Sequence, residues 1–241
     1  ITPGTAYVYE PLVRMNRTAA GEVLPHLAES WEFSEDGTQL TFTLRDDVTW
    51  SDGEPFTSAD VKFTWDLVLS GETPTAYPFT SVEAPDDRTI VVTYDAQSFQ
   101  DLAGFATRQI VPAHVWSEQN VREWTNPEPV GTGPAVLEKF SPQQITFAIR
   151  DDYWGGESKG LEKLTLNAVT GDAQRSQILS GQMDFGTFGW PNAQAEFVDK
   201  APYTNFYGFS PTGGSDGLIF NTEQAPFDDP AVRRALRDAV D

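Results

Sequence analysis

The stretch from residue 24 to residue 61 constrains the fold more than any other part of this chain. Its centre predicts a β-hairpin, because Trp31–Phe33 and residues 40–44 flank Asp36-Gly37, where glycine accepts the positive φ of a turn. In the second strand, apolar residues alternate with threonines, which predicts one buried face. The apolar positions are Leu40, Phe42 and Leu44.

A helix is predicted directly after this hairpin. Thr57 can act as its N-cap, and Asp60 then occupies the third helical position, where the helix dipole favours a negative charge. Ser70-Gly71 is typical of a helix end. Three apolar residues fall on one face at helical spacing, namely Val61, Trp65 and Val68.

The remaining chain mixes strand and helix patterns without regular alternation, so we expect an α/β fold of the mixed α+β kind. The predicted strands cover residues 7–13, 89–94, 144–149, 183–185, 203–209 and 218–220. The predicted helices cover 172–179 and 192–198, and a last one begins at Pro230 with Asp229 as N-cap.

Charge and composition restrict the classes of partner. The chain has 241 residues and a net charge of −20, from 36 acidic against 16 basic residues. Such a surface disfavours nucleic acids and anionic membranes, which bind through Lys and Arg. It indicates a halophile-like or an ordinary acidic extracellular habitat. There is no cysteine, so neither disulfides nor zinc–thiolate sites can form.

No motif in the chain predicts catalysis. The two histidines, His26 and His114, lie near prolines and lack metal-ligand spacing, so we interpret them as structural or solvent-exposed. Four Asp-Asp pairs lack the calcium-loop pattern and favour turns and helix caps. The segment Gly131-Thr132-Gly133 lacks the lysine of a phosphate-binding loop and predicts a tight turn. We therefore expect no enzyme, no metal and no cofactor.

Three separated blocks resemble one known family. The first holds Leu24-Pro25-His26-Leu27-Ala28-Glu29-Ser30-Trp31-Glu32 and Trp50-Ser51-Asp52-Gly53. The second holds Val130-Gly131-Thr132-Gly133-Pro134 and Asp152-Tyr153-Trp154-Gly155. The third runs from Phe220-Asn221-Thr222 to Asp229-Pro230-Ala231-Val232-Arg233. Together they resemble the N-terminal half of the family 5 extracellular solute-binding proteins, which capture peptides and some oligosaccharides for ABC importers.

The resemblance implies a periplasmic-binding-protein-like architecture in which two lobes close on a ligand. Residues 1–23 and 161–215 would form the core of the first lobe, and residues 24–160 its accessory subdomain. Residues 216–241 would begin the second lobe, whose remainder lies outside this chain. The resemblance also implies an ABC permease as partner, and an extracellular or periplasmic location with a lipid anchor as an option.

The ligand-binding residues are predicted partly from chemistry and partly from the resemblance. In the segment 186–192 two glycines let a ligand approach the backbone, and Phe188 and Trp190 offer stacking faces. The alternative for Trp190 is a buried loop anchor. With the positions that the resemblance adds, the candidates are Thr5, Tyr9, Gly186, Thr187, Phe188, Trp190, Tyr207, Phe209 and Asn221.

The expected function is therefore capture of a short peptide or an oligosaccharide, and the choice between these ligands stays open. A secreted hydrolase of polysaccharide or peptide is the alternative from another class, because carboxylate pairs can meet in space without sequence spacing. A sensory or adhesion module that keeps the binding fold without transport is the third.

Overall fold

A computed structural model gives the fold of residues 5–16, 22–71, 77–99, 102–157, 159–169, 171–186, 192, 194–200 and 219–239. These belong to two compact units, Ile1–Tyr207 and Gly208–Asp241. Within the ranges given, none of the helices has the length and apolar character that a bilayer span requires.

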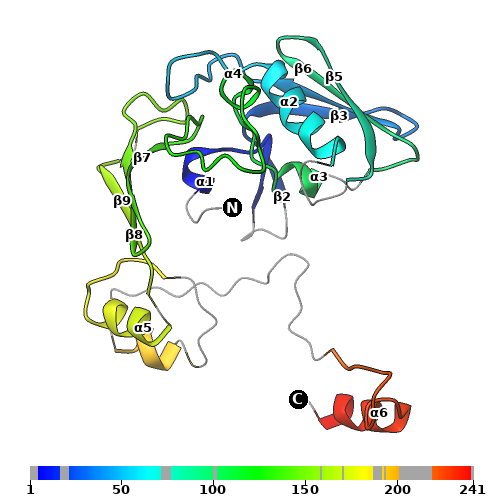
Figure 1. Cartoon of the computed structure of the whole chain (residues 1–241), viewed down its shortest axis with the longest axis vertical. Helices are drawn as coiled ribbons and strands as arrows, with labels where there is room; N and C mark the ends of the chain where they lie inside the picture. Colours follow the sequence, from blue (N-terminus) through cyan, green and yellow to red (C-terminus); the bar gives the residue numbers. More distant parts are fainter. Residues whose placement is uncertain are drawn as a thin grey trace. The chain divides into compact units, whose positions relative to one another are not determined.

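A four-stranded antiparallel sheet dominates the first unit (Figure 1). Its order is β3-β4-β6-β5, built from β3 (Ala28–Phe33), β4 (Gln39–Leu44), β6 (Thr89–Tyr94) and β5 (Phe79–Asp86). The predicted hairpin is confirmed: Phe33 pairs with Leu40, and Gly37 in the turn has a φ of 67°. Leu40, Phe42 and Leu44 are fully buried, as their alternation predicted.

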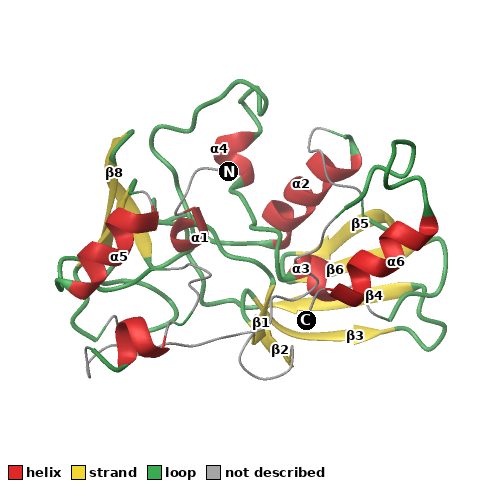
Figure 2. Cartoon of the chain, turned by 90° about the horizontal axis from the view of Figure 1, so that it is seen from below, coloured by secondary structure: helices red, strands yellow, loops and turns green. Residues whose placement is uncertain are grey.

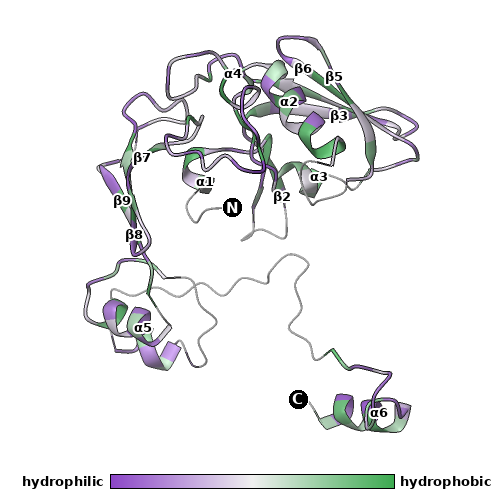
Figure 3. Ribbon diagram, in the orientation of Figure 1, coloured by the Kyte–Doolittle hydropathy of each residue, from purple (hydrophilic) through white to green (hydrophobic). Residues whose placement is uncertain are grey.

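The helix α2 (Ser58–Leu69) packs across β5 and β6 (Figure 2). Its predicted start is confirmed, because Thr57 is the N-cap and its backbone N–H donates to Asp60 Oδ2 at 3.0 Å. Hydrophobic and hydrophilic stretches alternate along α2 (Figure 3), and Val61, Trp65 and Val68 are all buried. One helical face therefore covers the sheet.

The first unit also contains two smaller antiparallel sheets and several helices. A two-stranded sheet pairs β1 (Val13–Asn16) with β2 (Glu22–Pro25), and a three-stranded sheet has the order β7-β8-β9. The latter consists of β7 (Ala135–Ser141), β8 (Gln144–Ile149) and β9 (Lys163–Asn167). The helices are α1 (Thr5–Val8), α3 (Leu102–Phe105), α4 (Ala113–Trp116), α5 (Gly171–Leu179) and the π-helix η1 (Gln194–Val198).

The predicted strand over residues 7–13 is wrong. The segment forms the helical turn α1 up to Val8, and β1 begins only at Val13. The backbone groups between them bond to separate loops: Val8 O accepts from Gly133 N at 2.8 Å, and Glu10 O accepts from Ile110 N at 2.9 Å. Val8, Tyr9, Leu12 and Val13 are buried as in an apolar strand, but tertiary contacts replace a sheet neighbour.

Two further predictions near the C-terminal side need correction. The strand predicted at residues 183–185 is absent, because the backbone N–H groups of Gln182 and Met183 both donate to Gln177 O at the end of α5. The helix predicted at 192–198 is shorter and is a π-helix. The strand predicted at residues 203–209 lies outside the described residues, as does Leu218, and residues 219–220 are not in a strand.

The second unit is described from residue 219 to residue 239 and holds α6 (Pro230–Ala239). The predicted cap is confirmed, because Asp229 Oδ1 accepts a hydrogen bond from the Ala231 N–H at 2.7 Å. The rings of Phe220 and Phe227 stack at 5.0 Å.

Candidate ligand-binding site

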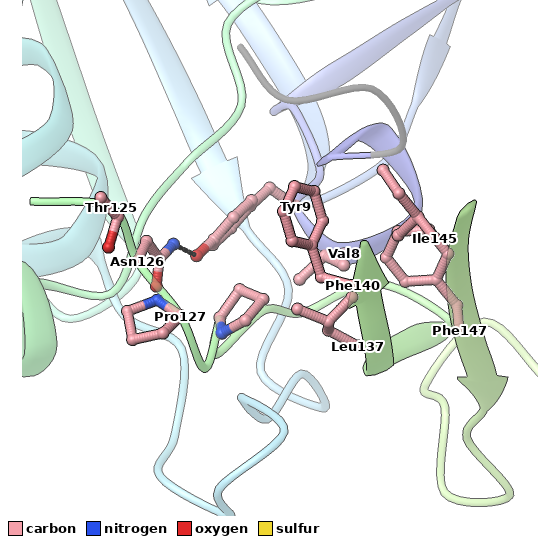
Figure 4. Close-up of a pocket in the computed structure, with 10 residues that line it drawn as sticks. Val8, Tyr9, Thr125, Asn126, Pro127, Leu137, Phe140, Ile145 and Phe147 are labelled. Atoms are coloured by element: carbon pink, nitrogen blue, oxygen red, sulfur yellow. Dashed lines mark hydrogen bonds between the residues drawn. The ribbon is translucent and has the colours of Figure 1, made fainter. Parts of the chain in front are cut away.

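A pocket of about 320 Å³ opens beside the C-terminal end of α1 (Figure 4). Its walls come from α1, from the loop before β7, and from β7 and β8. Most of the lining is apolar. The lining residues are Val8, Tyr9, Thr125, Asn126, Pro127, Pro129, Leu137, Phe140, Ile145 and Phe147.

Tyr9 supplies a polar group in this wall. Its side chain is buried, and its hydroxyl oxygen accepts a hydrogen bond of 2.7 Å from Asn126 Nδ2 (Figure 4). Burial raises the pKa of the Tyr9 phenol, and the hydrogen bond from Asn126 only partly offsets this. Tyr9 therefore keeps its proton at neutral pH. Asn126 has a φ of 48°, in the left-handed region that asparagine tolerates.

The neighbouring Glu10 holds this segment in place through a buried hydrogen-bond network. Its fully buried carboxylate accepts from Tyr153 Oη at 2.6 Å, from Trp154 Nε1 at 2.9 Å and from Arg14 at 3.2 Å. His26 Nε2 lies 2.9 Å from the same carboxylate. These partners come from β1, from the turn between β2 and β3, and from the loop after β8. Glu10 therefore connects three parts of the unit.

Electrostatics within the network favour the ionised form of Glu10. Burial by itself would raise the pKa of this carboxyl group, because it disfavours the charge. The hydrogen bond and positive charge of His26, with the bonds from Tyr153 and Trp154, outweigh burial and place the pKa below its ordinary value. Burial raises the pKa of the Tyr153 phenol, and the adjacent Glu10 carboxylate raises it further. The centre of the network is therefore the ionised carboxylate of Glu10, surrounded by hydrogen-bond donors.

The glycines of the segment 130–134 allow the backbone to approach α1 closely. A Cβ at Gly131 would lie 2.0 Å from Val8 O, and one at Gly133 would lie 2.4 Å from Tyr7 O. Arg150 stabilises the same segment, because its Nη1 donates a hydrogen bond to Gly131 O at 3.2 Å. The predicted tight turn thus has a packing reason, because only glycine fits against the segment that carries Tyr9.

Three of the predicted ligand-binding residues besides Tyr9 lie among the described residues. Thr5 begins α1. Gly186 packs against α5 so closely that a Cβ added at this position would lie 2.7 Å from Ile178 Cδ1. Asn221 belongs to the second unit and is exposed, and its Oδ1 accepts from the Glu223 N–H at 3.1 Å. Thr187, Phe188, Trp190, Tyr207 and Phe209 lie outside the described residues, so their roles stay predictions.

The histidines and aspartate pairs have structural partners. His26 lies in the Glu10 network, and His114 pairs with Asp52 at 2.8 Å. Asp47 pairs with Arg45, and Asp229 caps α6. Within the part of the chain that the structure describes, no group of three or more His, Cys, Asp or Glu side chains could hold a metal ion.

Two residues that shape this site, Glu10 and Asn126, were not predicted from the sequence. Glu10 stands alone between apolar and aromatic residues, and a single acid in such a run is a signal for a buried, partnered carboxylate. Asn126 carries no comparable signal, because an asparagine between Thr125 and Pro127 is typical of any turn.

The chain belongs to a known class: the family model of bacterial extracellular solute-binding proteins, family 5 (middle region), matches residues 22–241. The fold agrees with this class. A periplasmic oligopeptide-binding protein from Thermotoga maritima, solved with bound mannohexaose, superimposes with a TM-score of 0.77 at 24% identity. That match covers 98% of this chain and 46% of the other.

Two relatives are similar to this chain over nearly all of its length. The nickel-binding periplasmic protein of Escherichia coli is 30% identical over 97% of this chain and 46% of its own length. A putative ABC transporter peptide-binding protein of Brucella ovis is 31% identical over 96% of this chain and 45% of its own length. This chain therefore spans about half the length of these relatives.

Proposed function

We propose that the protein is the solute-binding component of an ABC importer and captures a short peptide or an oligosaccharide outside the cytoplasmic membrane. The observation that carries this proposal is the family match over residues 22–241, which includes the pocket walls from the loop before β7 and from β7 and β8. The names of the relatives support capture of a small solute, and the peptide-binding name of the Brucella relative favours peptide.

The proposed site has two sides. This chain supplies one, built on Tyr9 and its pocket, with Thr5 and Gly186 of the same unit as further proposed contacts. Residues absent from this chain supply the other side, on a second lobe that begins near residue 216. Closure of two lobes on a ligand buries it from both directions, and a few polar groups then set specificity.

The partner in this proposal is a membrane permease of the ABC type. The binding protein works in the periplasm or at the cell surface, where a lipid anchor can hold it near the permease. Catalysis has no part in the proposal. The hydrolase alternative gains no support from the relatives, and an assay with chromogenic glycoside and peptide substrates tests it directly.

Native mass spectrometry of the full-length protein tests the proposed function. The protein is purified without denaturation, and the mass shift of the native ion over the denatured one identifies any bound solute. We expect the mass of a short peptide or a sugar oligomer at near one-to-one occupancy. A full-length protein that carries no solute and gains none when incubated with peptide and oligosaccharide mixtures would contradict the proposal.

A further inference from the structure

We propose that the pocket beside Tyr9 is a subsite for one bulky, uncharged, apolar side chain of a peptide ligand. This inference rests on the proposed function and adds the chemical class of the solute. It follows from the lining, the size and the polar groups of the pocket.

The lining excludes charged groups. None of the ten lining residues is Lys, Arg, His, Asp or Glu, although the chain carries a net charge of −20. The floor is made by Leu137, Ile145 and Phe147, and the exposed ring of Phe140 stands at the rim (Figure 4). A charged side chain entering here would lose its hydration without finding a counter-ion, whereas an apolar one would gain from burial.

The size suits a large side chain. A cavity of about 150 Å³ lined by apolar groups already accommodates benzene. At about 320 Å³, this pocket holds a phenylalanine- or leucine-sized group together with neighbouring backbone atoms. A methyl group would leave most of the pocket unfilled, so alanine should be a poor occupant.

The polar groups favour a peptide over a sugar. Each sugar ring presents several hydroxyls that need partners, and among the described lining residues only Tyr9, Thr125 and Asn126 have polar side chains. Asn126 Oδ1 is buried and has no hydrogen-bond partner, which leaves one acceptor for an N–H donor such as a peptide amide. This oxygen is not exposed to solvent, so pairing with a ligand N–H requires a small shift of the segment that carries Asn126.

Saturation-transfer NMR on the 241-residue chain tests the subsite with two single-side-chain probes, N-acetylphenylalanine amide and N-acetyllysine amide. We expect transfer to the phenylalanine probe and at least about fivefold less to the lysine probe. The variant Thr125→Trp, at an exposed position on the rim, should fill the pocket and reduce transfer to the phenylalanine probe about fivefold.

A matched control is Thr80→Trp, which places the same ring at an exposed position on β5 and should leave transfer unchanged. If Thr125→Trp does not fold, Phe140→Ala replaces it, because Phe140 is 60% exposed and its loss should weaken probe binding without unfolding the chain. Equal transfer to both probes, or undiminished transfer in the rim variant that folds, would overturn the subsite.

Competition between peptides in the full-length protein separates this inference from the proposed function. If the protein retains peptides but selects Ala-Phe-Ala no better than Ala-Lys-Ala, only the subsite is wrong. If it retains neither peptides nor sugars, the proposed function itself fails. Preference for Ala-Phe-Ala that disappears in Thr125→Trp supports both.

Discussion

The two larger sheets of the first unit contain the same kind of alternating strands but differ in what covers them. In the four-stranded sheet, α2 lies across β5 and β6, and the inward-facing residues of β4 and β6 are buried almost completely, namely Leu40, Phe42, Leu44, Ile90, Val92 and Tyr94. In the three-stranded sheet, β9 has no buried residue and Phe140 of β7 is 60% exposed. Among the described residues, the twelve-residue helix α2 closes the core over the first sheet, whereas the four-residue helix α1 packs against β7 and leaves an apolar pocket beside it.

Aromatic packing shows the same difference. Under α2, the ring of Trp65 lies 5.2 Å from that of Phe79 and 4.9 Å from that of Phe105, and all three are buried. Such contacts contribute to stability beyond the area that they bury. At the three-stranded sheet, Phe147 meets Tyr7 at 6.2 Å, and Tyr7 is 38% exposed. The better-packed aromatic core thus lies at the first sheet, and the proposed subsite lies at the second.

The largest expected effect comes from Trp65→Ala. Removing this fully buried ring leaves a cavity in the core between α2 and the sheet, so we expect a loss of about 3–5 kcal/mol in the free energy of unfolding. Urea denaturation measures the loss. The matched change at the other sheet, Phe140→Ala, should cost under about 1 kcal/mol because its ring is already largely in water. Comparable losses for both would contradict the contrast between the sheets.

Glu10→Gln should have the next largest effect, because it tests the network that joins the two regions. At neutral pH the variant removes the negative charge that His26 and Arg14 face, and we expect a loss of about 3 kcal/mol. The difference between the two proteins should shrink in acid. The folded-state pKa of Glu10 lies below its ordinary value of 4.5, so its contribution is full above that value and is lost as pH falls through the folded pKa.

Urea melts of both proteins at about pH 7 and about pH 3 measure this convergence, and the other carboxylates cancel because both proteins share them. Glu29→Gln is the control, since its exposed pair with Arg88 should contribute under about 1 kcal/mol at either pH. A gap between Glu10→Gln and the parent protein that widens in acid would mean that the carboxylate is not stabilised as the structure indicates.

The sequence predicted the first sheet well because its signals are local. A turn glycine, a threonine N-cap and strict alternation sit within residues 24–61, and each acts on its near neighbours. The same holds for α6, where Asp229 and Pro230 mark the start of the helix. Elements with a complete local signal can be predicted without knowledge of their tertiary neighbours.

The candidate site was harder to predict because its parts meet only in three dimensions. Tyr9 and Asn126 are separated by 117 residues, and Glu10 and Trp154 by 144. The expected strand over residues 7–13 failed for the same reason, since Gly133 and Ile110 take up its backbone hydrogen bonds. The resemblance identified Tyr9 as a candidate, but the pocket beside it required the arrangement of β7 and β8.

We propose that this chain supplies one side of a two-sided binding site, and isothermal titration calorimetry can test this proposal. Ala-Phe-Ala is titrated into the 241-residue chain and into the full-length protein under the same conditions. We expect tight binding to the full-length protein and a Kd of roughly 1 mM or weaker for the chain alone, because only one face of the ligand is covered. Equal affinity for the two proteins would place the whole site within residues 1–241 and contradict the proposal.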